Sequence, residues 1–302
     1  MSILYKLNKY SGTFLFKTPN TITYSIFNYL YNKFIINLED ADDDIKFFHE
    51  KGYLKPNINF KEEVLQLKDT LNENNKIESK SKFKYHLNNN SIDKIKNIIN
   101  SSKFLNLINK IEKYFNLKIY LIDVTINRNF PINSEIEHSE NVYSNNYHVD
   151  YYIMNFFKMF INLHDVDQTQ GPMNFYSKKD TKKFIKFNNY KDRSNYNIKN
   201  EKDLGLVKNI GSAGDILVCS TPQCLHRASS PDNGKFRDML FLSFAVTSEN
   251  KSSSNGVLSF EKDHFNDIWK NSGILPKKLC KPKSARQQVS MFRNFMKYKI
   301  RH

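Results

Sequence analysis

The feature that most constrains the fold is a series of short segments after residue 117 in which side chains alternate with a period of two. The clearest segment, 156–163, has two faces: Phe157, Met159, Ile161 and Leu163 on one, and Phe156, Lys158, Phe160 and Asn162 on the other. This is the period of a β-strand. Similar segments lie at 118–126, 206–210, 215–219 and 236–247, and short turns separate most of them. Short connections favour antiparallel pairing, so we predict an antiparallel barrel or jelly roll.

The first 115 residues are predicted to form a mostly helical layer. Expected helices lie at 21–36, 42–52, 61–73, 92–99 and 103–115, with residues 53–56 extended. The helix at 42–52 has three aspartates at its start and Gly52 at its end, which are favourable terminal residues. We expect a single domain over residues 1–302, with the barrel core at 116–250 and a basic helical tail at 251–302. Residues 177–204 are expected to be a long polar insertion.

A histidine and an aspartate two residues apart, His148 and Asp150, stand in one extended segment. Extended backbone points both side chains to the same side. A second histidine, His226, follows a strongly apolar segment and lies near a strand end. Two histidines and one carboxylate form the ligand set of non-haem Fe(II) oxygenases, which leaves coordination positions open. The alternative for His226 is an ordinary core or surface histidine.

Arg237 begins a segment whose two faces are both largely apolar. A buried guanidinium needs an anionic partner because an unpaired buried charge is costly. A carboxylate held through two hydrogen bonds is the natural one. Two alternatives stay open for Arg237, namely an ion pair with an acid of the protein and a position at a strand end in water.

These residues resemble the phytanoyl-CoA dioxygenase family of Fe(II)/2-oxoglutarate-dependent oxygenases. The resemblance spans about residues 40–247 and rests on the following stretches: Phe47-Phe48-His49-Glu50-Lys51-Gly52-Tyr53-Leu54, Tyr147-His148-Val149-Asp150, Lys158-Met159-Phe160-Ile161-Asn162-Leu163, Gly171-Pro172-Met173, Gly214-Asp215, and His226 with Arg237. It implies a double-stranded β-helix, a cupin-like jelly roll, with Fe(II) as cofactor and 2-oxoglutarate and O2 as cosubstrates. It also implies hydroxylation of an unactivated C–H bond with release of succinate and CO2.

The resemblance also assigns roles to residues. His148, Asp150 and His226 would bind the iron, and Arg237 would bind the distal carboxylate of 2-oxoglutarate. Lys158 and Asn146 are further candidates for cosubstrate contacts, although a solvated strand lysine is an equally good interpretation of Lys158. Related halogenases lack the carboxylate ligand, so Asp150 favours hydroxylation or desaturation. The chain departs from the family at Ala228, where a serine is frequent, and at 174–179, where Gly-Ser-His is usual.

The net charge of +15 raises the question of a nucleic-acid partner. Lysines are spread along an Asn-, Ile- and Lys-rich sequence, which is typical of an AT-rich coding bias, and only 178–186 and 277–301 form basic patches. We therefore expect a small-molecule or lipid- or sugar-linked substrate and keep two alternatives, the same chemistry on nucleic acid and a non-catalytic binding barrel. Three cysteines without regular spacing and the lack of an apolar leader or span favour an intracellular, cytoplasmic protein.

Overall fold

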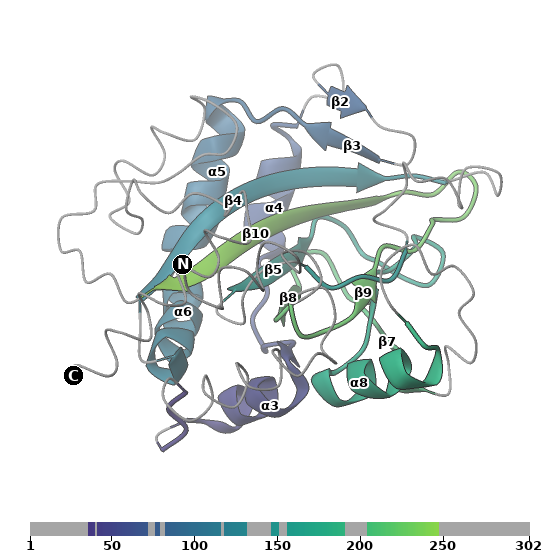
Figure 1. Ribbon diagram of the computed structural model, residues 1–302. Coiled ribbons are helices and arrows are strands. Elements are labelled where there is room, and N and C mark those ends of the chain that lie inside the picture. Colours follow the sequence, from purple (N-terminus) through teal and green to yellow (C-terminus); the bar gives the residue numbers. More distant parts are fainter. Residues whose placement is uncertain are drawn as a thin grey trace, which may run out of the picture.

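The computed structural model describes residues 36–39, 41–71, 76–78, 82–115, 118–131, 146–150, 156–190 and 204–247. Within these ranges the strands form two antiparallel sheets (Figure 1). The large sheet has seven strands, in the spatial order β1 (Tyr53–Leu54), β8 (Ile216–Cys219), β5 (Phe156–Asn162), β10 (Arg237–Thr247), β4 (Lys118–Asn129), β3 (Lys82–Tyr85) and β2 (Lys76–Glu78). The small sheet has three, in the order β7 (Val207–Lys208), β6 (Asn174–Phe175) and β9 (His226–Arg227).

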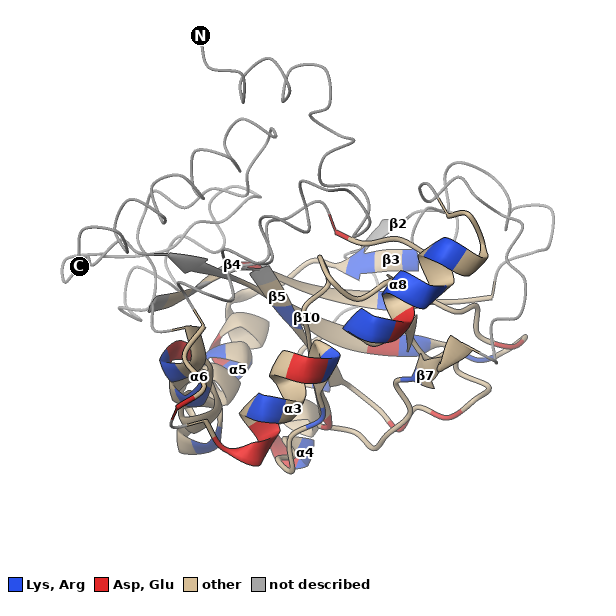
Figure 2. Ribbon diagram, turned by 60° about the horizontal axis from the view of Figure 1, so that its bottom comes forward, with Lys and Arg blue, Asp and Glu red and all other residues tan. Residues whose placement is uncertain are grey.

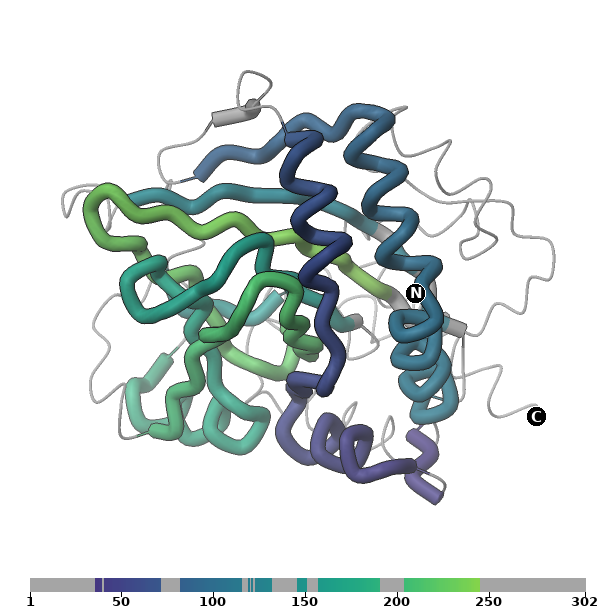
Figure 3. The backbone as a smooth tube through the Cα atoms, turned by 180° about the vertical axis from the view of Figure 1, so that it is seen from behind, coloured from purple at the N-terminus to yellow at the C-terminus, as the bar shows by residue number. Residues whose placement is uncertain are grey.

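Helices cover one face of the large sheet, as the view from behind shows (Figure 3). The described helices are α3 (Asp43–Lys51), α4 (Lys61–Lys68), α5 (Asn89–Asn100), α6 (Ser102–Phe115) and α8 (Lys178–Phe187). The Asp42 carboxylate accepts a hydrogen bond from the Ile45 amide at the start of α3. Gly52 ends that helix at φ 81°, a conformation in which glycine has no steric penalty. Of the described helices, none has the length and the apolar character needed to cross a bilayer.

The strands of the large sheet divide their side chains between a core and a cavity. Leu240, Leu242 and Phe244 of β10 join the main hydrophobic core, which also includes residues of α4, α5 and α6. The alternate residues of β10 face the other way and line a cavity with residues of β4 and β5. The predicted alternation is therefore confirmed over residues 157–163 and 237–244, and it leaves one face of the sheet available for a site.

The structure corrects three expectations. The layer before residue 115 is not only helical, because β1, β2 and β3 belong to the large sheet. The helix predicted at 61–73 ends at Lys68. The polar insertion at 177–204 begins with the helix α8. The expected antiparallel pairing is confirmed, but the described strands lie in two open sheets without a closed barrel, so the jelly roll stays a prediction. The helix expected at 21–36 and the tail at 251–302 fall outside the described residues.

The first part of that insertion forms helix α8 because its sequence is amphipathic. The Ser177 hydroxyl accepts from the Asp180 amide at its start, and Thr181, Phe184 and Ile185 are buried. The opposite face carries exposed lysines, and much of the α8 ribbon is therefore blue in Figure 2. Lys178 differs from them, because its Nζ donates to the His49 carbonyl at 2.7 Å and burial lowers its pKa to about 8. The basic patch at 178–186 is therefore one face of a packed helix.

An ion pair between Arg128 and Asp238 holds β4 against β10. The guanidinium donates to both carboxylate oxygens at 2.8 Å, and the side chain of Asp238 is buried. We expect Arg128→Met to lower the free energy of unfolding by about 3 kcal/mol, because it leaves a buried carboxylate without its counter-charge. Urea denaturation measures the change. A loss below about 1 kcal/mol would show that water solvates Asp238 in the variant.

Candidate metal centre

Two extended segments from distant parts of the chain place His148 and His226 opposite each other. The residues form an isolated antiparallel bridge in which each amide donates to the other's carbonyl at 2.9 Å. Their rings lie 4.4 Å apart between centroids. His226 begins β9, and β6 lies on its other side with Phe175 as its partner. The short segment around His148 therefore continues the small sheet by one residue pair.

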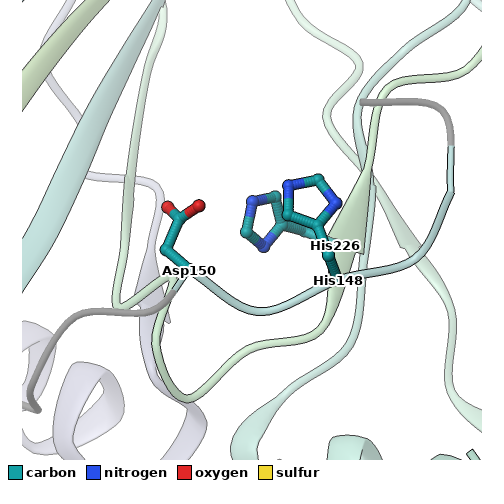
Figure 4. A group of neighbouring side chains, drawn as sticks. All are labelled: His148, Asp150 and His226. Carbon is teal, nitrogen blue, oxygen red and sulfur yellow. The ribbon is translucent and has the colours of Figure 1, made fainter. Parts of the chain in front are cut away.

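Alternation along the first segment directs His148 and Asp150 to the same side, as predicted. Tyr147 and Val149 are buried in a cluster with Tyr176 and Phe184. The Asp150 amide donates to the Thr221 carbonyl, which holds the segment against the turn after β8. Figure 4 shows the three side chains converging. Ligand atoms of His148, Asp150 and His226 all lie within 4.8 Å of one another.

Hydrogen bonds with backbone carbonyls select the tautomer of both imidazoles. The His148 Nδ1–H donates to the Asn146 carbonyl at 2.8 Å, and the His226 Nδ1–H donates to the Cys224 carbonyl at 3.0 Å. A carbonyl only accepts, so Nδ1–H is the donor in each ring, and in the neutral form of the imidazole the lone pair is then on Nε2. Such outer contacts orient histidine ligands in metal sites. Both rings are therefore prepared to ligate through Nε2.

The Asp150 carboxylate is ionised and paired with a cation. Burial alone would raise its pKa, but Lys158 and the two histidines outweigh burial and hold the pKa far below its usual range. The Lys158 Nζ lies 2.7 Å from Asp150 Oδ2. This contact was not foreseen, because it joins β5 to the segment around His148 only in the folded chain. Two imidazoles and a carboxylate, all possible metal ligands, thus lie close together.

Arg237, the first residue of β10, is 2% exposed and lines the same cavity as the histidines. Burial lowers its pKa to about 10. Among the described residues, its Nε and Nη1 have no hydrogen-bond partner. The neighbouring acid, Asp238, is taken by Arg128. Within the described part of the chain, Arg237 is therefore buried and is not paired with an acid of the protein.

The other candidates have local roles. Asn146 acts on the site through its carbonyl, and it is not among the residues that line the cavity. The His164 Nε2 accepts from the Asp238 amide at 2.9 Å, and the His49 ring bonds the Tyr114 hydroxyl. Cys219 and Cys224 are buried free thiols. The cosubstrate contact predicted for Asn146 stays a prediction.

A polar face of β4 is the main feature that we did not predict. Asp123, Thr125, Asn127 and Asn129 all line the cavity, which has a volume of about 200 Å³. The alternate residues Val124 and Ile126 point into the core. The signal is present in the sequence as a period-two pattern that continues to residue 129, beyond the strand end expected at 126. The cavity therefore has a metal-ligand wall and a polar sheet wall.

We expect Lys158→Met to lower the free energy of unfolding of the metal-free protein by about 2 kcal/mol, since Asp150 would lose its counter-charge in a largely dry site. A divalent metal would replace that charge, so added Zn(II) should recover most of the loss. Thermal denaturation with and without metal measures both effects. Lys183→Met, which breaks an exposed pair with Asp180, should cost less than about 0.5 kcal/mol. A loss at Lys158 that metal does not recover would contradict this assignment.

No family model matches the sequence, and no curated protein matches it. Several solved structures are similar at low identity. EctD from S. alaskensis in its apoform has 11% identity and a TM-score of 0.49 over 81% of this chain and 90% of that chain. HygX from Streptomyces hygroscopicus with nickel and 2-oxoglutarate bound has 12% identity and a TM-score of 0.45 over 68% and 87%. The apo non-heme monooxygenase ThoJ has 10% identity and a TM-score of 0.46 over 86% and 96%.

Proposed function

We propose that the chain is an Fe(II)/2-oxoglutarate-dependent dioxygenase that hydroxylates a C–H bond of a small molecule. One observation carries the proposal. A buried arginine with hydrogen-bonding atoms unused by the described residues lies in the same cavity as a histidine–aspartate–histidine cluster. The cluster suits the metal, and the arginine suits the far carboxylate of a 2-oxo diacid. A simple metal site would not need the buried arginine.

The donor set fits Fe(II) on chemical grounds. Two Nε2 lone pairs and one carboxylate oxygen are the facial set of non-haem iron sites, and they leave positions for a bidentate 2-oxo acid and for O2. When bound, the ion supplies oxidation of the substrate by O2, coupled to conversion of 2-oxoglutarate to succinate and CO2. The presence of Asp150 favours hydroxylation over halogenation, because its carboxylate occupies the position that a halide would need.

The residues of this chain bind and orient the cosubstrate. The Arg237 guanidinium offers Nε–H and Nη1–H donors to the distal carboxylate, in a pocket where water does not compete. Lys158 lines the cavity next to Asp150, and we propose that it contacts the 2-oxo acid end. Asn146 holds the ring of His148. We further propose that the two sheets form the double-stranded β-helix of the phytanoyl-CoA dioxygenase type and that residues 1–302 form one domain.

An anaerobic absorption spectrum tests the proposal without a known substrate. Protein with Fe(II) should develop a visible charge-transfer band when 2-oxoglutarate is added and lose it when 2-oxoglutarate is removed by dialysis. The matched control is succinate, which has both carboxylates but no 2-oxo group and should give no band. If 2-oxoglutarate produces no band although Fe(II) binds, the proposed cosubstrate is wrong.

A further inference from the structure

A buried asparagine lies directly opposite Arg237 in the large sheet. Asn129 of β4 is the register partner of Arg237 in β10, and both residues line the cavity. Directly opposite residues of an antiparallel pair point to the same face of the sheet, with Cβ atoms roughly 4.5–5.5 Å apart. Asn129 is 4% exposed and Arg237 is 2% exposed. This end of the cavity therefore holds a carboxamide and a guanidinium side by side.

Contacts within the protein do not explain the Asn129 carboxamide. Of the described residues, none forms a hydrogen bond with this side chain. Arg237 has the same deficit, because its Nε and Nη1 have no partner in the described part of the chain. Buried polar groups in folded proteins are nearly always hydrogen-bonded, and a buried donor without a partner is destabilising. Two neighbouring donors of this kind indicate a ligand that accepts hydrogen bonds from both.

The charges around Asn129 favour an anion as that ligand. On the other side of β4, Lys82 of β3 is the second register partner of Asn129, and it also lines the cavity. Asn129 thus lies between two positively charged residues, Lys82 and Arg237. The acid next to Arg237 in the chain, Asp238, is paired with Arg128. A carboxylate only accepts hydrogen bonds and has about four lone-pair sites, so it can bond a guanidinium and a carboxamide at once.

We propose that Asn129 is a second anchor for the distal carboxylate of the cosubstrate and that it selects diacids over 2-oxo acids with a neutral end. The inference rests on the proposed function for the identity of the ligand. The Asn129 Nδ2–H donates to a carboxylate oxygen beside the Nε–H and Nη1–H donors of Arg237. A 2-oxo acid with a methyl group at this end would leave all of these donors buried without partners. The two residues therefore recognise the carboxylate together.

Titration calorimetry on Zn(II)-loaded protein tests the anchor without turnover. The ligands are 2-oxoglutarate and 2-oxopentanoate, which has a methyl group where 2-oxoglutarate has its distal carboxylate. Asn129→Leu should raise the dissociation constant for 2-oxoglutarate about tenfold and leave that for 2-oxopentanoate unchanged, because only the diacid reaches the lost donor. The matched control is Asn100→Leu, at an exposed asparagine that ends α5, and it should change neither constant.

A second variant, Asn129→Asp, tests the contact with Arg237 independently. The new carboxylate would pair with the Arg237 guanidinium and repel the anion, so 2-oxoglutarate binding should weaken more than about 100-fold. The same pairing should raise the Tm of the ligand-free protein. Parent-like affinity in this variant would contradict the inference, even if Asn129→Leu fails to fold.

Two results with Asn129→Leu would overturn the anchor: unchanged affinity for 2-oxoglutarate, or an equal loss for both 2-oxo acids, which would indicate a general disturbance of the pocket. Glutarate, which has both carboxylates but no 2-oxo group, separates this inference from the proposed function. If the parent protein binds glutarate as tightly as 2-oxoglutarate and Asn129→Leu weakens both, the proposed cosubstrate is wrong and the carboxylate anchor stands. If the parent protein binds neither diacid, both proposals are wrong.

Discussion

The His148→Ala variant should lose metal-dependent 2-oxoglutarate decarboxylation by more than about 100-fold, because even outer-sphere contacts of metal ligands are worth about 10–100-fold. The Asn146 carbonyl orients the His148 ring. Alanine has no atom that could replace the Nε2 ligand of this ring. Iron content after dialysis and release of labelled CO2 measure the two losses independently. We expect both to fall together.

His86→Ala is the matched control for that variant, since His86 is an exposed histidine outside the site. It should keep its iron and its activity. Iron retention by His148→Ala at the level of the parent protein would place the metal elsewhere and refute the proposed ligand set.

Arg237→Met should raise the dissociation constant for 2-oxoglutarate about 100-fold, equivalent to roughly 2.7 kcal/mol, because two charge-assisted hydrogen bonds are lost. The same substitution should not lower the free energy of unfolding. The guanidinium is buried with Nε and Nη1 unpaired among the described residues, so a methionine of similar shape removes a desolvation cost. The free energy of unfolding without 2-oxoglutarate should equal or exceed that of the parent protein.

Arg128→Met, in the same pair of strands, should have the opposite effects on stability and on 2-oxoglutarate affinity. It should destabilise the protein and leave 2-oxoglutarate affinity unchanged, because Arg128 bonds Asp238 and does not line the cavity. Arg237→Met would contradict the proposal if it destabilised the protein as Arg128→Met does. That result would mean that Arg237 has a structural partner instead of a ligand.

Two kinds of sequence pattern account for the helices and strands that could be predicted: side chains that alternate along a strand, and favourable residues at the ends of a helix. Helix α3 has its capping aspartate and its glycine in the sequence, and β10 has two alternating faces along its length. The hairpin of β2 and β3 was missed because lysines occupy alternate positions and few apolar residues mark it. Helix α8 was missed because only Thr181, Phe184 and Ile185 are buried among its many lysines.

The site was predictable to the extent that its parts are local. The common direction of His148 and Asp150 follows from extended backbone, and a later histidine and arginine completed the hypothesis. The bridge between His148 and His226 and the contact of Lys158 with Asp150 depend on the packing of distant segments. No spacing in the sequence encodes them. The polar face of β4 is an intermediate case. Its alternation is visible in the sequence, but only the folded structure shows that this face lines the cavity.

The single bridge between His148 and His226 has a consequence for handling the protein. A metal held by both residues would clamp two chain segments that are otherwise joined there by one pair of backbone hydrogen bonds. Ligand binding to the folded state raises stability in proportion to the logarithm of free ligand, about 2.7 kcal/mol at 100 times the dissociation constant. Chelator in a purification buffer would therefore expose this edge to proteases, and batches with different metal content would melt at different temperatures.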